Sequence, residues 1–270
     1  MHSQRTFFGE ALGTFILVLF GCGSVATTIL FDAHKGLMQV AIAWGMGVTL
    51  AIYATRHLSG AHLNPAVSCA MVVAGRLSSR RLGLYVGAQL TGAVLGALTL
   101  YGLFGPSIGV YEATHRIVRG SPESVRTASM FGEFYASPGS HALVTLPLAM
   151  VAEALGAFLL VLLVLALTES ANEGRPDGPF APVLIGATIT SIVCLIAPLT
   201  QCGINPARDF GPRLVSYLMG WGSAALPDNV GGFFFVYVLS PIIGGCLAAV
   251  FFVRILEPAM LADRLKGDRP

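Results

Sequence analysis

Two Asn-Pro-Ala tripeptides are the most distinctive polar groups in a strongly apolar chain of 270 residues. The first comprises Asn64, Pro65 and Ala66, and the second Asn205, Pro206 and Ala207. Proline at the first position of a helix sacrifices no hydrogen bond, and asparagine immediately before it is a good N-cap. Each tripeptide therefore predicts the start of a short helix, whose N-terminus carries a positive partial charge and an amide that can donate into a lumen.

The segments around the tripeptides, residues 58–72 and 200–216, are apolar but are broken by glycine and proline and are too short to span a membrane. We expect the residues upstream of each tripeptide to be extended, so that their carbonyls form a ladder of acceptors along one wall of a pore. The ladder comprises Gly60, Ala61, His62 and Leu63, and then Gln201, Cys202, Gly203 and Ile204. With apolar helices opposite, such a pore suits a solute with hydroxyls on one edge and carbons on the other.

Three charged residues lie in or beside apolar runs, where a charge is expensive and functional by default. Arg208 is expected to donate hydrogen bonds to solute hydroxyls and to repel cations. Glu10 and Glu153 have two readings: a proton relay, or carboxylates that accept backbone N–H bonds from the two broken segments. Their equivalent positions and the lack of further acids in the apolar runs favour the second reading.

The elements that position these groups are expected to be membrane helices. Hydrophobic residues make up 54% of the chain and charged residues only 11%, against about 25% charged in a typical soluble domain. This composition argues against a disordered chain, a nucleic-acid binder and most soluble enzymes. Charge-free runs predict six spans, near residues 7–30, 38–57, 83–106, 147–168, 180–199 and 232–256. No nucleotide-binding, nucleophile or metal-ligand motif is present, so we expect no enzyme, cofactor or metal.

The chain also repeats itself. Residues 10–19 match residues 153–162 in eight of ten positions, and the tripeptides recur 141 residues apart. Repeat 1 covers about 7–110 and repeat 2 about 147–256. Each repeat holds three spans, so the second enters the membrane from the opposite side, as an inverted repeat with its site at the midplane. The broken segments then fit two re-entrant half-helices that meet there.

The charge distribution predicts the orientation of this single transmembrane domain, residues 1–270. Ten basic residues lie on the side of the two termini and four on the other, which places both termini in the cytoplasm of a cell (inner or plasma) membrane. Residues 107–146 are then an extracellular loop, and residues 257–270 a cytoplasmic tail.

Over about residues 7–256 the chain resembles the major intrinsic proteins, or aquaporins, and within them the glycerol facilitator (aquaglyceroporin) branch. The resemblance rests on Ser-Gly-Ala-His-Leu-Asn-Pro-Ala-Val at 59–67 and Asn-Pro-Ala-Arg-Asp-Phe-Gly-Pro-Arg at 205–213, with shorter stretches at 115–121, 178–179 and 220–222. It implies an all-α membrane protein of six helices and two half-helices. It also implies passive passage of glycerol, related small neutral solutes and some water, exclusion of ions and protons, and a homotetramer with one pore per protomer in the lipid bilayer.

The same resemblance assigns a selectivity filter to Trp44, Val193, Cys202 and Arg208. Trp44 and Arg208 match glycerol facilitators, whereas Val193 stands in place of their usual glycine and Cys202 in place of their second aromatic. The order of preference among polyols, urea and neutral metalloid hydroxides therefore stays open. Five further positions mark the branch: Phe104, Asp209, Arg213, Pro241 and Ile242.

Three alternatives remain beside a glycerol channel. The chain could be a water-, urea- or metalloid-preferring channel of the same fold. It could be a proton-coupled transporter that uses Glu10 and Glu153. It could also be a junctional or structural membrane protein.

Overall fold

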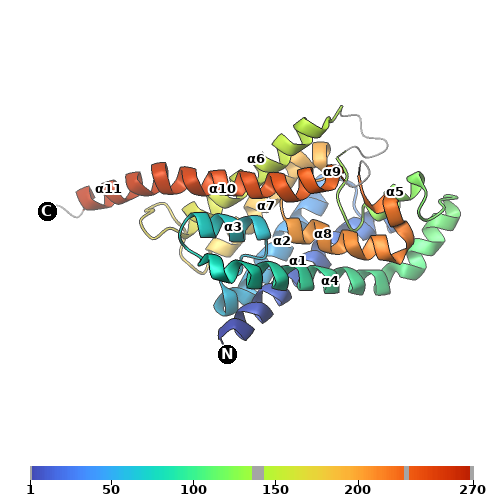
Figure 1. Cartoon of the computed structure of the whole chain (residues 1–270), viewed down its shortest axis with the longest axis horizontal. Coiled ribbons are helices and arrows are strands. Elements are labelled where there is room, and N and C mark those ends of the chain that lie inside the picture. The colour runs from blue at the N-terminus through green and yellow to red at the C-terminus, as the bar shows by residue number, and fades with distance from the viewer. Residues whose placement is uncertain (1, 136–142, 228–230, 268–270) are drawn as a thin grey trace.

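The computed structural model describes residues 2–135, 143–227 and 231–267, and its regular elements in these ranges are all helical (Figure 1). Six helices in the described residues are long and apolar enough to cross a membrane, which confirms the predicted number. They are α1 (His2–Phe31), α2 (Leu37–Ser59), α4 (Ser79–Thr114), α6 (Leu146–Thr168), α7 (Ala181–Thr200) and a composite sixth helix. The sixth runs through α9 (Gly231–Phe233), the π-helical η4 (Phe234–Leu239), α10 (Ser240–Phe251), the π-helical η5 (Phe252–Leu256) and α11 (Glu257–Gly267).

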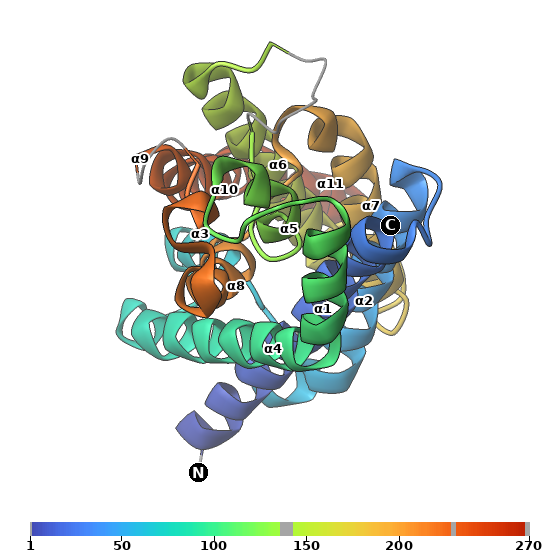
Figure 2. The same cartoon turned by 90° about the vertical axis from the view of Figure 1, so that its right-hand side faces the viewer.

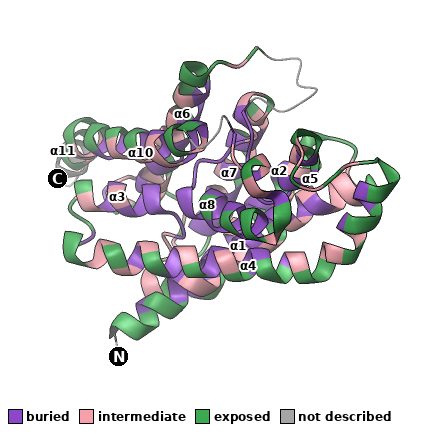
Figure 3. Cartoon of the chain, turned by 45° about the vertical axis from the view of Figure 1, so that its right-hand side comes forward, coloured by how far each residue is buried: buried purple, intermediate pink, exposed green. Residues whose placement is uncertain are grey.

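Two short helices occupy the interior, α3 (Pro65–Val73) and α8 (Pro206–Ser216). Each begins at the proline of its tripeptide, because proline fixes a helical φ and the asparagine before it caps the first turn. Helix α10 packs on α3, and α4 packs on α8, so the long helices flank the short ones (Figure 2). Both short helices are largely buried (Figure 3). The predicted pair of half-helices is confirmed.

The inverted repeat appears as two equivalent close crossings. A Cβ atom added at Gly92 of α4 would lie 2.0 Å from the carbonyl oxygen of Ala11 on α1. In the second repeat, a Cβ at Gly244 of α10 would lie 1.9 Å from the carbonyl oxygen of Ala154 on α6. Only glycine allows these backbones to approach so closely, as in other tightly packed membrane helices. The two crossings bring α1 and α6, with their glutamates, beside the re-entrant segments.

Two helices extend beyond their predicted ends. Helix α4 continues past Pro106 to Thr114, although the sequence predicts an end near 106. A proline removes one hydrogen bond and its ring crowds the carbonyl four residues earlier, but continuing the helix keeps the other backbone groups bonded within an apolar segment. The sixth helix likewise continues beyond 256 to Gly267, so the predicted tail is helical there. Residues 136–142 of the predicted loop and 268–270 of the tail lie outside the described residues.

The rest of the predicted 107–146 loop includes two short helical turns, η1 (Pro122–Ser124) and α5 (Val125–Ala128). They pack against the chain that follows α8, η2 (Tyr217–Trp221) and η3 (Gly222–Ala225). The indole of Trp221 is fully buried, packs against the tilted ring of Phe131 with ring centroids 5.5 Å apart, and donates to the Thr127 hydroxyl at 2.9 Å. Glu133, which follows these turns, contacts the second half-helix through Asp209 and Arg213.

Large apolar side chains cover the outside of the molecule. Leu95, Leu103 and Val110 project from α4, and they are 51%, 66% and 68% exposed. The outer faces of α4 and α10 are exposed in Figure 3, although they consist largely of apolar residues. Such a continuous apolar exterior is unfavourable in water and suits contact with lipid chains.

Candidate pore and constriction

The two asparagines cap the half-helices in the same way. The side-chain oxygen of Asn64 accepts the N–H of Ala66 at 2.8 Å. The side-chain oxygen of Asn205 accepts the N–H of Ala207 at 3.1 Å and that of Arg208 at 3.2 Å. The caps satisfy backbone donors that a helix N-terminus leaves unpaired.

The amide nitrogen of each asparagine bonds to the other repeat. Asn64 Nδ2 donates to the carbonyl of Ile204 at 3.0 Å, and Asn205 Nδ2 donates to the carbonyl of Leu63 at 2.8 Å. These reciprocal bonds hold the N-termini of α3 and α8 against each other. An amide nitrogen carries two hydrogens, so each asparagine keeps a second donor for the lumen.

Glu10 of α1 accepts three hydrogen bonds at the first re-entrant segment. Its Oε1 accepts the N–H of His62 at 3.0 Å, and its Oε2 accepts the N–H of Leu63 at 2.7 Å. The Oε2 atom also accepts a bond from Gln89 Nε2 at 2.8 Å. The carboxylate is completely buried, and these donors replace the water that it has lost.

Glu153 of α6 makes the equivalent contacts in the second repeat. Its Oε1 accepts the N–H of Gly203 at 2.9 Å and the hydroxyl of Thr200 at 2.6 Å, and its Oε2 accepts the N–H of Ile204 at 2.5 Å. This carboxylate is also completely buried. Both glutamates thus accept hydrogen bonds from backbone N–H groups of a re-entrant loop, which is the geometry of the second reading given above.

The re-entrant segments are not extended, so that prediction is wrong. The φ angles are +56° at Ala61, +54° at Leu63, +69° at Cys202 and +44° at Ile204, all in the left-handed region. Consecutive N–H groups therefore point the same way, toward one carboxylate, whereas in an extended strand they would alternate. Left-handed backbone costs a non-glycine residue roughly 1–2 kcal/mol, and the bonds to the buried glutamates offset that cost.

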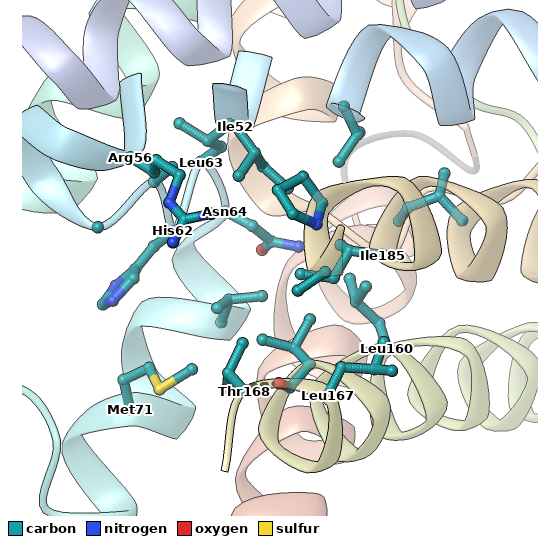
Figure 4. Close-up of a pocket in the computed structure, with 18 of the residues that line it drawn as sticks. Ile52, Arg56, His62, Leu63, Asn64, Met71, Leu160, Leu167, Thr168 and Ile185 are labelled. Atoms are coloured by element: carbon teal, nitrogen blue, oxygen red, sulfur yellow. Dashed lines mark hydrogen bonds between the residues drawn. The ribbon is translucent and has the colours of Figure 1, made fainter. Parts of the chain in front are cut away.

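A cavity of about 460 Å³ opens on the side of the membrane that carries the end of α2 (Figure 4). Asn64 projects into it, and the apolar side chains of Leu160 and Ile185 lie on the facing wall. The first four residues of the predicted ladder line this cavity: Gly60, Ala61, His62 and Leu63. One wall therefore offers backbone and amide groups, and the other offers carbons.

The cavity narrows beyond the asparagines to a pocket of about 40 Å³. The structure brings all four predicted filter residues to this pocket: Trp44, Val193, Cys202 and Arg208. Cys202, Gly203 and Ile204 of the second ladder line it too, whereas Gln201 lies at a separate hollow farther along. The two cavities share Asn64, Asn205, Leu17, Val48, Leu160 and Ile189, so they form one path.

The guanidinium of Arg208 dominates the narrow pocket. Its central carbon lies 4.1 Å from the centre of the Trp44 ring, in a cation–π contact. Arg208 is 3% exposed, and its Nη1 atom has no hydrogen-bond partner in the part of the chain that the structure describes. A buried donor without a partner is costly, so this nitrogen is an unsatisfied hydrogen-bond donor at the pocket.

The structure adds two residues that the sequence did not point to. Glu133, between α5 and α6, forms a buried ion pair with Arg208. Gln89 of α4 links Glu10 to the hydroxyl of Ser68 on α3, at 3.0 Å. The available signal for Glu133 was a single acidic residue among aromatic ones. Because it lies in a long predicted loop, the sequence did not indicate that Arg208 is its partner. A single glutamine in the charge-free run 82–111 was the signal for Gln89.

The branch markers lie around the path and are absent from the described lining of both cavities. Asp209 and Arg213 form a fully buried ion pair on α8, with Nη2 and Oδ2 2.8 Å apart. Phe104 lies within α4, ten residues before its end, because that helix is longer than predicted. Pro241 and Ile242 lie in the first turn of α10, where the preceding π-helical turn accommodates the proline.

Comparisons with known proteins agree with this geometry. The family model described as "Major intrinsic protein" matches residues 1–252. A glycerol uptake facilitator protein of Pseudomonas aeruginosa is 41% identical over 244 residues, which is 89% of this chain and 84% of that protein. A propanediol uptake facilitator of Citrobacter freundii is 39% identical over 263 residues, 96% and 94% of the two chains. The X-ray structure of the aquaglyceroporin from Plasmodium falciparum superposes with a TM-score of 0.82 at 25% identity, and covers 96% of this chain and 98% of its own.

Proposed function

The chain belongs to the major intrinsic protein family, and on that premise we propose that it is a passive channel for glycerol and related small neutral solutes, with some water. The observation that carries the proposal is the continuous path, with amide, carbonyl and guanidinium groups on one wall and aliphatic side chains on the other. A polyol in such a path exchanges the hydrogen bonds of water for those of the wall, while its carbons contact Leu17, Leu160 and Ile189.

Trp44, Val193, Cys202 and Arg208 act as the selectivity filter in this proposal. Arg208 Nη1 donates to one hydroxyl, and the Trp44 ring contacts the carbon edge of the solute. Val193 and Cys202 supply an aliphatic group and a thiol in place of a second ring, so the carbon side of the filter is less aromatic. The filter therefore admits both glycerol and propanediol, because propanediol has one hydroxyl fewer and loses only one hydrogen bond to the wall.

Ion and proton exclusion follows from the centre of the path. The positive ends of α3 and α8 face each other there. Asn64 and Asn205 each donate one amide hydrogen to a carbonyl of the other repeat and keep a second one for the lumen. A water molecule at this point turns its oxygen toward both asparagines. The water molecules on either side of it in the path then cannot donate a hydrogen bond to its oxygen, so a continuous proton wire is broken.

The channel is oriented with both termini in the cytoplasm, because the basic residues gather on that side. It assembles as a homotetramer with a pore in each protomer. A reporter fused to the C-terminus that is active only in the cytoplasm tests the orientation. Size-exclusion chromatography with light scattering in detergent tests the assembly.

Stopped-flow light scattering on proteoliposomes tests the function. Glycerol entry is expected to be linear in its gradient, faster than in empty liposomes, and indifferent to an imposed proton gradient. Accumulation of glycerol against its gradient that an uncoupler abolishes would establish a transporter and overturn the channel.

A further inference from the structure

Glu133 is the one acidic side chain within the described residues that forms an ion pair with Arg208. Both side chains are almost completely buried, at 7% and 4% exposure. The carboxylate binds Nη2 of the guanidinium, while Nη1 stays without a partner within those residues, and Arg208 lines the constriction. One edge of the guanidinium is therefore held by the protein and the other is left for a solute.

The second half-helix holds the backbone of Glu133 from both sides. The Glu133 N–H donates to Asp209 Oδ2 at 2.8 Å, and its carbonyl accepts from Arg213 Nη2 at 2.6 Å. A Cβ at the neighbouring Gly132 would lie 2.7 Å from the central carbon of the Arg213 guanidinium, so the chain passes directly over this group. The buried Asp209–Arg213 pair thus positions the peptide that delivers the Glu133 carboxylate to Arg208.

The charges of the two ion pairs at the constriction balance only when Glu133 is ionised. Arg208 and Arg213 contribute two positive charges, and Asp209 and Glu133 two negative ones. Glu153 is the next acid, but its carboxylate accepts hydrogen bonds from Thr200, Gly203 and Ile204 and does not pair with Arg208. Without the Glu133 charge, the guanidinium and the positive end of α8 would face the path together.

We propose that Glu133 is a specificity-determining residue of the constriction, the counter-ion that prevents Arg208 from capturing small anions. The inference rests on the proposed glycerol channel and names a determinant of its preference for neutral solutes. A guanidinium binds planar anions through two parallel N–H bonds, and pairing with a carboxylate occupies part of that fork. The paired guanidinium still bonds a neutral hydroxyl through Nη1, but it offers an anion no net charge.

The test compares Glu133→Gln with the wild type in proteoliposomes. Glutamine keeps an oxygen that can accept from Arg208 Nη2 and removes only the charge. Glycerol flux is measured in potassium nitrate and in potassium gluconate of equal ionic strength, since nitrate is planar and small and gluconate is too large to enter. Nitrate currents are recorded in planar bilayers. Glu112→Gln is the matched control, because Glu112 forms another largely buried pair, with Arg119, away from both cavities.

The wild type and Glu112→Gln should give equal glycerol flux in the two salts. In Glu133→Gln, nitrate should slow glycerol severalfold, or should itself carry current, because the unpaired guanidinium binds a planar anion. The double variant Glu133→Gln with Arg208→Gln is neutral again and should lose the sensitivity to nitrate.

Two results would overturn the inference. One is a folded Glu133→Gln protein that is indifferent to nitrate, and the other is a nitrate current in the wild type. If Glu133→Gln does not yield monodisperse protein, Glu133→Ser is judged by the same criteria. Wild-type glycerol flux in gluconate separately tests the channel, so failure of the proposed function is distinguishable from failure of this inference.

Discussion

The two re-entrant loops share one backbone arrangement but differ in the side chains around that backbone. Both place an asparagine at the N-terminus of a half-helix, and both tie consecutive N–H groups to a buried glutamate. The 141-residue offset between the repeats pairs Ser68 with Asp209 and Val67 with Arg208. The first loop therefore carries a neutral network where the second carries charges.

This difference distinguishes the residues that support the loops from those proposed to select the solute. In the first loop, Gln89 joins Glu10 to the Ser68 hydroxyl, and no charge other than the glutamate is involved in these contacts. In the second loop, Asp209 turns instead to Arg213 and to the backbone of Glu133. The common parts hold the asparagines in place, and in the proposed channel the parts unique to the second loop contact the solute.

The largest effect is expected where the loops are alike. Glu10→Ala leaves the N–H groups of His62 and Leu63 and the Gln89 amide without their acceptor, at about 1–3 kcal/mol for each buried donor. That sum is comparable to the whole stability of a domain, so we expect little folded protein. Glu153→Ala should be equally damaging. Yield of monodisperse protein and thermal unfolding in detergent measure both.

A matched control and an intermediate variant sharpen this result. Glu123 is exposed, and Glu123→Gln should behave like the wild type. Glu10→Gln keeps one acceptor oxygen and should fall between the wild type and Glu10→Ala. A large difference in stability between the Glu10 and Glu153 variants would show that the loops are not supported alike.

The next effect is expected where the loops differ. Arg208→Val gives the second loop the residue that the first has at the equivalent position, Val67. It removes the cationic barrier at the constriction, so cations, or at least protons, should pass. Planar-bilayer conductance and a pH-sensitive dye inside liposomes measure the change. Val67→Ala should remain non-conducting, and conductance in that variant would assign ion exclusion to both loops.

A smaller effect is expected from the size of the constriction. Cys202 lines the 40 Å³ pocket, and the equivalent residue of the first loop is Ala61, at the wide cavity. Cys202→Phe restores an aromatic and narrows the pocket, so the ratio of glycerol to erythritol flux should rise several-fold while total flux falls. Val193→Gly should partly reverse the change. An unaltered ratio would place Cys202 outside the filter.

The smallest effect is expected outside the loops, at the ion pair between Arg76 and Glu169, with Nη2 and Oε2 2.5 Å apart. A hydrogen bond from the Ala171 N–H, together with Arg76, holds the pKa of Glu169 below its usual range. The stabilisation is therefore present above the ordinary glutamate pKa and is lost as the pH falls through the lowered value. Glu169→Gln should cost less than about 1 kcal/mol at neutral pH, and the difference in thermal unfolding should vanish in acid.

The sequence predicts the six spans and the half-helices because each rests on a local pattern. Apolar run length indicates the spans, and the Asn-Pro pair indicates where α3 and α8 begin. The left-handed backbone at Ala61 and Cys202 is not predictable in this way, because hydrogen bonds to glutamates about 50 residues distant impose it. The same holds for Glu133, whose partner lies 75 residues away. The helix end predicted near 106 is wrong because, in an apolar segment, ending a helix costs more than tolerating Pro106 within it.

The reciprocal bonds of Asn64 and Asn205 have a consequence for biosynthesis. The acceptor of the Asn64 amide, the Ile204 carbonyl, is made 140 residues later, after five of the six spans. Until then the first loop has Glu10 and Gln89 as partners from its own repeat, but not the second half-helix. The channel is therefore completed late, when the second repeat has inserted. A chain that stops before residue 204 contains only the first half-helix and no continuous path.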